Sequence, residues 1–174
     1  MTAALTHPQI YAYFRMALAT GLLTPQEMIA WTDRELLKVD LPSEELMELS
    51  LSGHLPYSQI IKNLYHMQAW SDYGLPLALL FARARTLLTR YPERLSKWVQ
   101  GLCLLNAEAY LPPDVKNTLS TLIALLEQFE QGFLSQAEVI AEMLDFLEME
   151  SDFLAQTDSE DLTALGIEIP PKGT

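Results

Sequence analysis

The sequence is poor in cysteine and glycine, and it lacks a long apolar run. Cys103 is the only cysteine among 174 residues, so no intrachain disulfide can form. Because it stands in the apolar run Gly-Leu-Cys-Leu-Leu, we expect a buried core thiol rather than a nucleophile. The longest apolar run, from Leu75 to Ala82, stops at Arg83 and is much shorter than the roughly 20 residues of a membrane-spanning helix.

The first residues also lack the features of a targeting segment. The stretch from Met1 to Pro8 has no basic part followed by an apolar part, so we expect no signal peptide. Together with the single cysteine, this favours a cytoplasmic location and gives no indication of membrane association.

Positive charge is scarce. The chain has 11 basic and 23 acidic residues, a net charge of −12. A free-standing nucleic-acid-binding protein needs a basic surface, so we expect no direct nucleic-acid partner. Between residues 117 and 171 there are twelve acids and no lysine or arginine. An acidic chain of this kind attracts a basic protein partner.

Strand patterns are missing as well. No segment alternates apolar and polar residues over a sustained length, and neither Asn-Gly nor Asp-Gly occurs. Apolar residues instead recur at helical spacing. The sequence therefore predicts an all-α fold, a single-domain bundle of about eight antiparallel helices over residues 1–166. Residues 167–174 should form an extended, poorly ordered tail, because Pro170 and Pro171 cannot continue a helix.

Prolines and capping residues set the expected helix boundaries. Helices are expected over 8–20, 42–51, 56–70 and 76–90, and further helices after Thr24, Pro92, Pro113 and Ser135. A short turn after Asp158 should be capped by Gly166. The helix over 76–90 is apolar on all sides in its first half, so we expect it at the centre. The helix after Pro92 should bury Leu95, Trp98, Val99, Leu102 and Cys103.

One weak internal repeat is present. Residues 21–30, Gly-Leu-Leu-Thr-Pro-Gln-Glu-Met-Ile-Ala, resemble residues 132–141, Gly-Phe-Leu-Ser-Gln-Ala-Glu-Val-Ile-Ala. A duplicated helical hairpin would explain the similarity and would give a pseudo-symmetric bundle. Convergence also explains it, because a helix stop followed by a capping box uses these residue types. We favour convergence.

Patterns that carry catalysis or metal binding are missing. The three histidines, His7, His54 and His66, lie on different segments, and none has a second ligand at a helical spacing typical of a metal site. There is no Gly-x-Ser-x-Gly elbow and no glycine-rich phosphate loop. We therefore predict no catalytic, cofactor or metal site, and a protein that is not an enzyme.

Acidic residues follow one face of the helix after Ser135. Glu138, Glu142, Asp145 and Asp152 are spaced by four, three and seven residues, and Glu148 lies near the same face. This face has three interpretations: a solvated surface, a partner for basic residues of this chain, or a docking surface for a basic protein. The candidate intrachain partners are Arg83, Arg85, Arg90, Arg94 and Lys97. Arg83 and Arg85 lie about 200° apart on a helix and cannot share a face.

Our main hypothesis is a non-enzymatic protein-protein interaction module that uses this acidic face. The alternative is a structural or assembly protein that forms a homodimer through an apolar helix face. The seam of the helix after Pro113 could serve either a dimer or the core, and it comprises Val115, Leu119, Leu122, Leu126 and Phe129. An enzyme whose site is assembled from distant residues is a third reading.

The segments 21–33 and 46–51 resemble a pattern in small helical, acidic bacterial proteins, some of which are immunity proteins of polymorphic toxin systems. The similarity spans about 30 residues, from 21 to 51, and much of it is capping chemistry. It implies an acidic, cytoplasmic helical protein that binds and neutralises a toxin, often a basic nuclease. It implies no individual functional residue.

Overall fold

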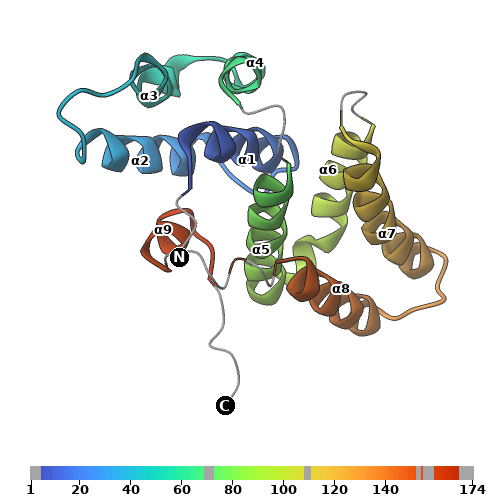
Figure 1. Ribbon diagram of the computed structural model, residues 1–174. Coiled ribbons are helices and arrows are strands. Elements are labelled where there is room, and N and C mark those ends of the chain that lie inside the picture. Colours follow the sequence, from blue (N-terminus) through green and yellow to red (C-terminus); the bar gives the residue numbers. More distant parts are fainter. Residues whose placement is uncertain (1–4, 69–72, 108–110, 152–153, 155–158, 169–174) are drawn as a thin grey trace.

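The computed structural model describes residues 5–68, 73–107, 111–151, 154 and 159–168 (Figure 1). Within this part the chain forms α-helices and short 3-10 helices and no strand, which confirms the all-α prediction. The α-helices are α1 (His7–Ala19), α2 (Pro25–Leu36), α3 (Glu44–Ser50), α4 (Tyr57–Met67), α5 (Gly74–Arg90), α6 (Leu95–Asn106), α7 (Pro113–Glu130), α8 (Gln136–Ser151) and α9 (Ser159–Ala164). The 3-10 helices are η1 (Leu51–His54) and η2 (Pro92–Arg94).

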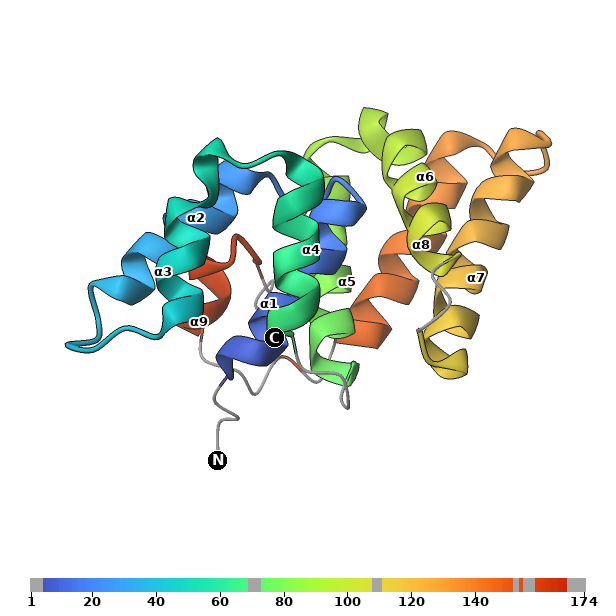
Figure 2. The same cartoon turned by 90° about the horizontal axis from the view of Figure 1, so that it is seen from above.

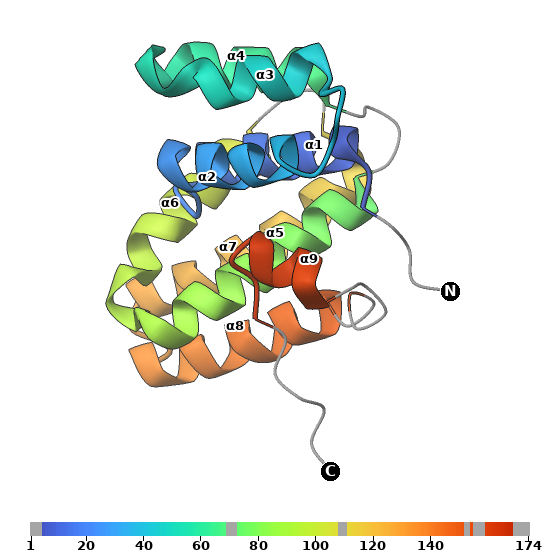
Figure 3. The same ribbon diagram turned by 90° about the vertical axis from the view of Figure 1, so that its left-hand side faces the viewer.

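Helix α5 stands at the centre of the molecule. It packs against α1 on one side and α8 on the other. The pair α1 and α2 is covered by α3 and α4, which form a second layer above it in Figure 3. Helices α6, α7 and α8 gather on the other side of α5 (Figure 2). This order agrees with the central position predicted for the helix over 76–90.

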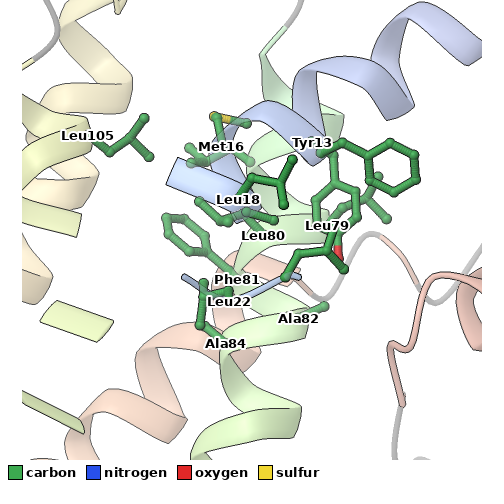
Figure 4. Close-up of a cluster of buried hydrophobic side chains, with 14 of the residues drawn as sticks. Tyr13, Met16, Leu18, Leu22, Leu79, Leu80, Phe81, Ala82, Ala84 and Leu105 are labelled. Atoms are coloured by element: carbon green, nitrogen blue, oxygen red, sulfur yellow. The ribbon is translucent and has the colours of Figure 1, made fainter. Parts of the chain in front are cut away.

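The buried apolar side chains form one cluster to which every α-helix contributes. Figure 4 shows Met16 of α1, Leu80 of α5 and Leu105 of α6 in this cluster. All residues from Pro76 to Ala84 are buried, so α5 has no solvent-facing side over its first half. Full burial of a leucine or phenylalanine stabilises a fold by about 1.5–3 kcal/mol, so this cluster is the main stabilising feature.

Helix α6 crosses the end of α1 at very close range. A Cβ atom added at Gly101 would lie 2.3 Å from the carbonyl oxygen of Thr20. No side chain fits at that distance, so glycine is required for the two backbones to approach each other.

The prediction for Cys103 is wrong. Leu95, Trp98, Val99 and Leu102 are buried as expected, but Cys103 is exposed. The inward face of α6 continues through Leu105, which is 1% exposed, whereas Leu104 is 70% exposed. A helix turns by about 100° per residue, so Cys103 and Leu104 fall on the solvent side of this face.

The chain beyond Gly166 stays in contact with the rest of the fold for two further residues. Ile167 is 1% exposed, and its N–H donates to the carbonyl of Leu162. The N–H of Glu168 donates to Oγ1 of Thr86. These two residues are therefore part of the folded structure, although they fall within the poorly ordered tail predicted for residues 167–174. The rest of that tail, 169–174, lies outside the described residues, so its prediction stays a prediction.

The two loops of the internal repeat have the same hydrogen bonds. Gly21 and Gly132 have φ values of 72° and 77°, and the N–H groups of the next two residues both donate to one carbonyl of the preceding helix. Capping boxes follow at Thr24 and Ser135. The helical pairs nevertheless pack differently, because α7 and α8 contact each other directly while α1 packs mainly on α4 and α5. The short turn predicted after Asp158 is α9, and Gly166 ends it with a φ of 70°. Because a glycine with positive φ also ends a helix outside the repeat, convergence of the capping residues is favoured over a duplication.

Candidate protein-binding surface

Helix α8 lies at the outside of the molecule, with one face against α5 and α7 (Figure 1). Val139, Met143 and Leu147 are buried on that face. Glu138, Glu142 and Asp145 are exposed on the opposite face, as their spacing predicts. Asp152, the fifth acid of the predicted surface, lies outside the described residues.

Glu138 is engaged at the start of its own helix. Its Oε2 accepts the N–H of Ser135 at 2.8 Å, and its own N–H donates to Oγ of Ser135 at 3.3 Å. Hydrogen bonds from Ser135 lower the pKa of Glu138. This carboxylate therefore serves mainly to satisfy N–H groups at the helix start.

Glu148 is paired within the chain. Nη2 of Arg85 on α5 lies 3.2 Å from its Oε2, and the glutamate side chain is 59% exposed. A pair this exposed contributes well under about 1 kcal/mol to stability, but it neutralises much of the charge. The intrachain interpretation of the acidic face thus holds for this residue.

Three other basic residues of the predicted cluster have different partners. Arg83 leaves α5 on the side away from Arg85 and donates to the carbonyls of Leu22 and Gly166. Arg90 pairs with Glu168. The guanidinium of Arg94 lies 5.1 Å from the centre of the Tyr91 ring. The predicted basic cluster therefore separates into individual contacts, and among the contacts that the described residues make, the pair of Arg85 with Glu148 is the one that reaches α8. For Lys97 the predicted contact stays a prediction.

The two remaining acids of this face are Glu142 and Asp145. In the described part of the chain neither has a hydrogen bond or an ion pair. Like charges at this spacing repel each other by a few tenths of a kcal/mol, about 0.2–0.5. Since no cation of the described chain offsets that repulsion, a basic group from outside would gain by binding here.

Two exposed apolar side chains lie close to these acids in the sequence, and sequence reasoning missed both. Met149 is 66% exposed and follows Asp145 by four residues, so Glu138, Glu142, Asp145 and Met149 form one stripe along α8. Phe133, in the loop before α8, is 75% exposed. The signal for Met149 was present, because the buried series Val139, Met143 and Leu147 excludes position 149 from the inward face.

A metal site and a reactive thiol are two other kinds of functional site. Within the described residues, no three His, Cys, Asp or Glu side chains are grouped so that they could hold a metal ion. Partial burial and the charges of Glu127 and Glu130 raise the pKa of the Cys103 thiol, which disfavours the nucleophilic thiolate. What the stripe on α8 can do is bind a complementary surface.

A groove of about 580 Å³ lies between α1, α2 and α9. Phe14 and Trp31 form part of its wall, and Glu27 and Asp33 line it as well. Both carboxylates accept hydrogen bonds from this chain, Glu27 from Thr24 and Arg83 and Asp33 from Ser50. These acids therefore stabilise the fold.

None of the helices in the described part of the chain is both long and apolar enough to span a bilayer. Comparison with protein-family models, with curated proteins and with solved structures found no match for this chain.

Proposed function

We propose that the protein is a non-enzymatic interaction module that binds a basic protein partner through the outward face of α8. The observation that carries this proposal is the pair of exposed carboxylates, Glu142 and Asp145, which have no partner in the described chain and share a stripe with exposed Met149. Glu148 lies at the edge of this stripe. Because it is already paired with Arg85, it should contribute less to binding the partner than Glu142 and Asp145.

Charge and apolar contact play different roles in this binding. The net charge of −12 accelerates the encounter with a basic protein. Met149 supplies apolar area at the centre of the contact, which slows dissociation. Because exposed charges are screened over about 8 Å at physiological ionic strength, the affinity falls as salt rises.

The specific form that we propose is an immunity-type inhibitor. Its partner is a basic toxin, whose active surface the acidic face of α8 covers in the cytoplasm of a bacterium. This step rests on the resemblance of segments 21–33 and 46–51 to such proteins. It agrees with the acidic, all-helical character of the chain.

A homodimer built on an apolar helix face is less well supported. Leu119, Leu122 and Leu126 of the α7 seam are at most 6% exposed, because α6 and α8 cover them. The side chain of Val115 is not described, and Phe129 is partly buried. The seam that would have formed the dimer belongs to the core.

Affinity capture at low and high salt tests the proposal. A tagged Glu142→Lys/Asp145→Lys protein is compared with the native protein and with Glu127→Lys/Glu130→Lys, which makes the same charge change at exposed positions of α7. We expect the native protein and the Glu127→Lys/Glu130→Lys variant to retain one basic protein at low salt. The Glu142→Lys/Asp145→Lys variant should not retain it, and high salt should release it from the native protein. The purified partner should then show at least tenfold weaker binding to the α8 variant. Equal retention by all three proteins would contradict the proposal.

A further inference from the structure

Exposed apolar side chains are frequent on the connection between α2 and α3, on the outer side of α3 and at the start of η1. They are Leu37, Val39, Leu41, Met47 and Leu51, with exposed fractions of 88%, 41%, 93%, 44% and 70%. Single exposed leucines are common, whereas a group of exposed apolar side chains is typical of an interaction site. These side chains are named here the α2–α3 surface.

The fold holds these side chains outward. Leu46 and Leu49 of α3 are buried at 1% and 0%, which turns Met47 and Leu51 to solvent. Met47 and Leu51 are four residues apart, so they lie one turn above the other. Ser50 donates a hydrogen bond to Asp33 of α2, and this contact fixes α3 beside α2. The α2–α3 connection lies at the far end of the molecule from α7 and α8 (Figures 1 and 2).

An acidic groove lies along α3, the helix that also carries Met47. It has a volume of about 330 Å³ and lies between α3 and α4. Its lining residues are Glu44, Glu45, Glu48, Asn63, His66 and Met67. Asn63 donates to Glu48 at 2.6 Å, whereas Glu44 and Glu45 have no hydrogen bond or ion pair in the described chain. The only cation between residues 37 and 51 is Lys38, which lies 2.6 Å from Glu35.

We infer that the α2–α3 surface docks a basic amphipathic segment of a protein partner. Apolar side chains of that segment cover Leu37, Leu41 and Met47, and its lysines or arginines enter the groove beside Glu44 and Glu45. Apolar contact flanked by opposite charge is the arrangement that gives both affinity and orientation. The groove supplies the negative charge, and the α2–α3 surface supplies the apolar area.

The charge pattern selects this occupant over two others. In a two-fold contact with a second copy, the same surface meets itself, so the glutamates of the two grooves would repel each other. An anionic membrane would meet the same repulsion. The inference goes beyond the proposed function, because it gives the protein a second binding surface far from α8 and hence the ability to hold two segments at once.

The test uses a defined probe, a fluorescent 18-residue peptide with leucines on one helical face and lysines on the other. A peptide of the same composition in scrambled order controls for charge alone. A photoreactive group on the first peptide identifies where it binds. We expect cross-links to residues 37–51 and an affinity about tenfold lower for Leu37→Ser/Leu41→Ser, since tenfold corresponds to about 1.4 kcal/mol. Both leucines are almost fully exposed, so these substitutions leave the packing unchanged.

Matched variants separate this inference from the proposed function. The Glu44→Lys/Glu45→Lys variant should bind the peptide with about tenfold lower affinity. The Leu104→Ser variant, changed at a 70% exposed position of α6, should bind it with unchanged affinity. Glu142→Lys/Asp145→Lys should leave the cross-links to 37–51 in place. Equal binding of the scrambled peptide would overturn the inference. A dimer in sedimentation that the Leu37→Ser/Leu41→Ser variant abolishes would also overturn it, since a second copy would then be the occupant.

Discussion

Arg83 of α5 donates a hydrogen bond from Nη1 to the carbonyl oxygen of Gly166 over 2.7 Å. The same guanidinium donates through Nε to the carbonyl of Leu22 at 3.1 Å and pairs through Nη2 with Glu27. Both carbonyls follow or belong to a glycine that ends a helix. One side chain of the central helix therefore holds the α1–α2 loop and the end of α9 together.

Replacing Arg83 with alanine should destabilise the fold strongly. The arginine side chain is 8% exposed, and the substitution removes the guanidinium donor from two carbonyls and from Oε1 of Glu27. We expect the free energy of unfolding to fall by about 3 kcal/mol. The loss should not be larger, because the Glu27 carboxylate stays partly solvated. Urea denaturation measures the change. The control is Arg85→Ala, whose exposed pair with Glu148 should be worth about 0.5 kcal/mol. Similar losses for both variants would contradict this role of Arg83.

Glu27 should make stability depend on acid pH. Burial alone would raise the pKa of Glu27, but hydrogen bonds from Thr24 and the charge of Arg83 outweigh burial and lower it. A carboxyl whose pKa is lowered by folding stabilises the folded state at pH values above its ordinary pKa of 4.5. This stabilisation is lost as the pH falls through the lower pKa of the folded state. Glu27→Gln should therefore reduce the decline of unfolding free energy below pH 4.5.

The matched control for this pH dependence is Glu138→Gln. Glu138 completes the same kind of capping box on α8, but no arginine contacts it in the described chain. We expect a smaller effect on the acid limb of the stability curve, measured by urea denaturation at a series of pH values. If Glu27→Gln and Glu138→Gln flatten the curve equally, the charge of Arg83 does not contribute.

Local chemistry explains which parts of the fold could be read from the sequence. Thr24, Glu27 and Gly21 act on neighbours within four residues, so their capping roles were predicted and are confirmed. The partners of Arg83 are 56, 61 and 83 residues away. The sequence predicted that Arg83 and Arg85 point in different directions, but which distant group each meets depends on how the helices pack.

The candidate surface was predicted only in part for the same reason. Glu142 and Asp145 are exposed because the period of α8 sets their face. Whether an exposed acid is already paired depends on α5, which brings Arg85 to Glu148. On α6, Leu104 and Leu105 are neighbours with exposed fractions of 70% and 1%. Hydropathy treats these two leucines alike, whereas the helical spacing from Leu102 places Leu105, and not Leu104, on the face that packs against α1 and α7.

A methyl group at Gly101 should destabilise the fold. The added Cβ would lie 2.3 Å from the carbonyl oxygen of Thr20, which is backbone and cannot move without separating α1 from α6. We expect Gly101→Ala to cost about 1–3 kcal/mol, the range for overpacked cores. Gly53→Ala is the control, because its Cβ would meet only Cδ1 of Ile29 at 3.4 Å. That variant should be neutral or slightly more stable in thermal unfolding, and a loss equal to that of Gly101→Ala would contradict the close approach as its cause.

Alanine substitutions at Gly166 and Gly132 should lower the free energy of unfolding by different amounts, although both glycines have positive φ. A Cβ at Gly132 meets nothing within 4 Å, so Gly132→Ala should cost only the backbone strain of about 1 kcal/mol. A Cβ at Gly166 would lie 2.2 Å from Nη1 of Arg83, so Gly166→Ala should also displace the guanidinium and cost about 2–3 kcal/mol.

A double-mutant cycle isolates that extra cost. In an Arg83→Ala background the guanidinium is absent, so Gly166→Ala should cost no more than Gly132→Ala, about 1 kcal/mol. Urea denaturation of the single and double variants gives the coupling energy directly. Additive effects of Arg83→Ala and Gly166→Ala would mean that Arg83 does not hold the end of α9. A clear coupling would show that Arg83 contributes to holding the end of α9 against the central helix.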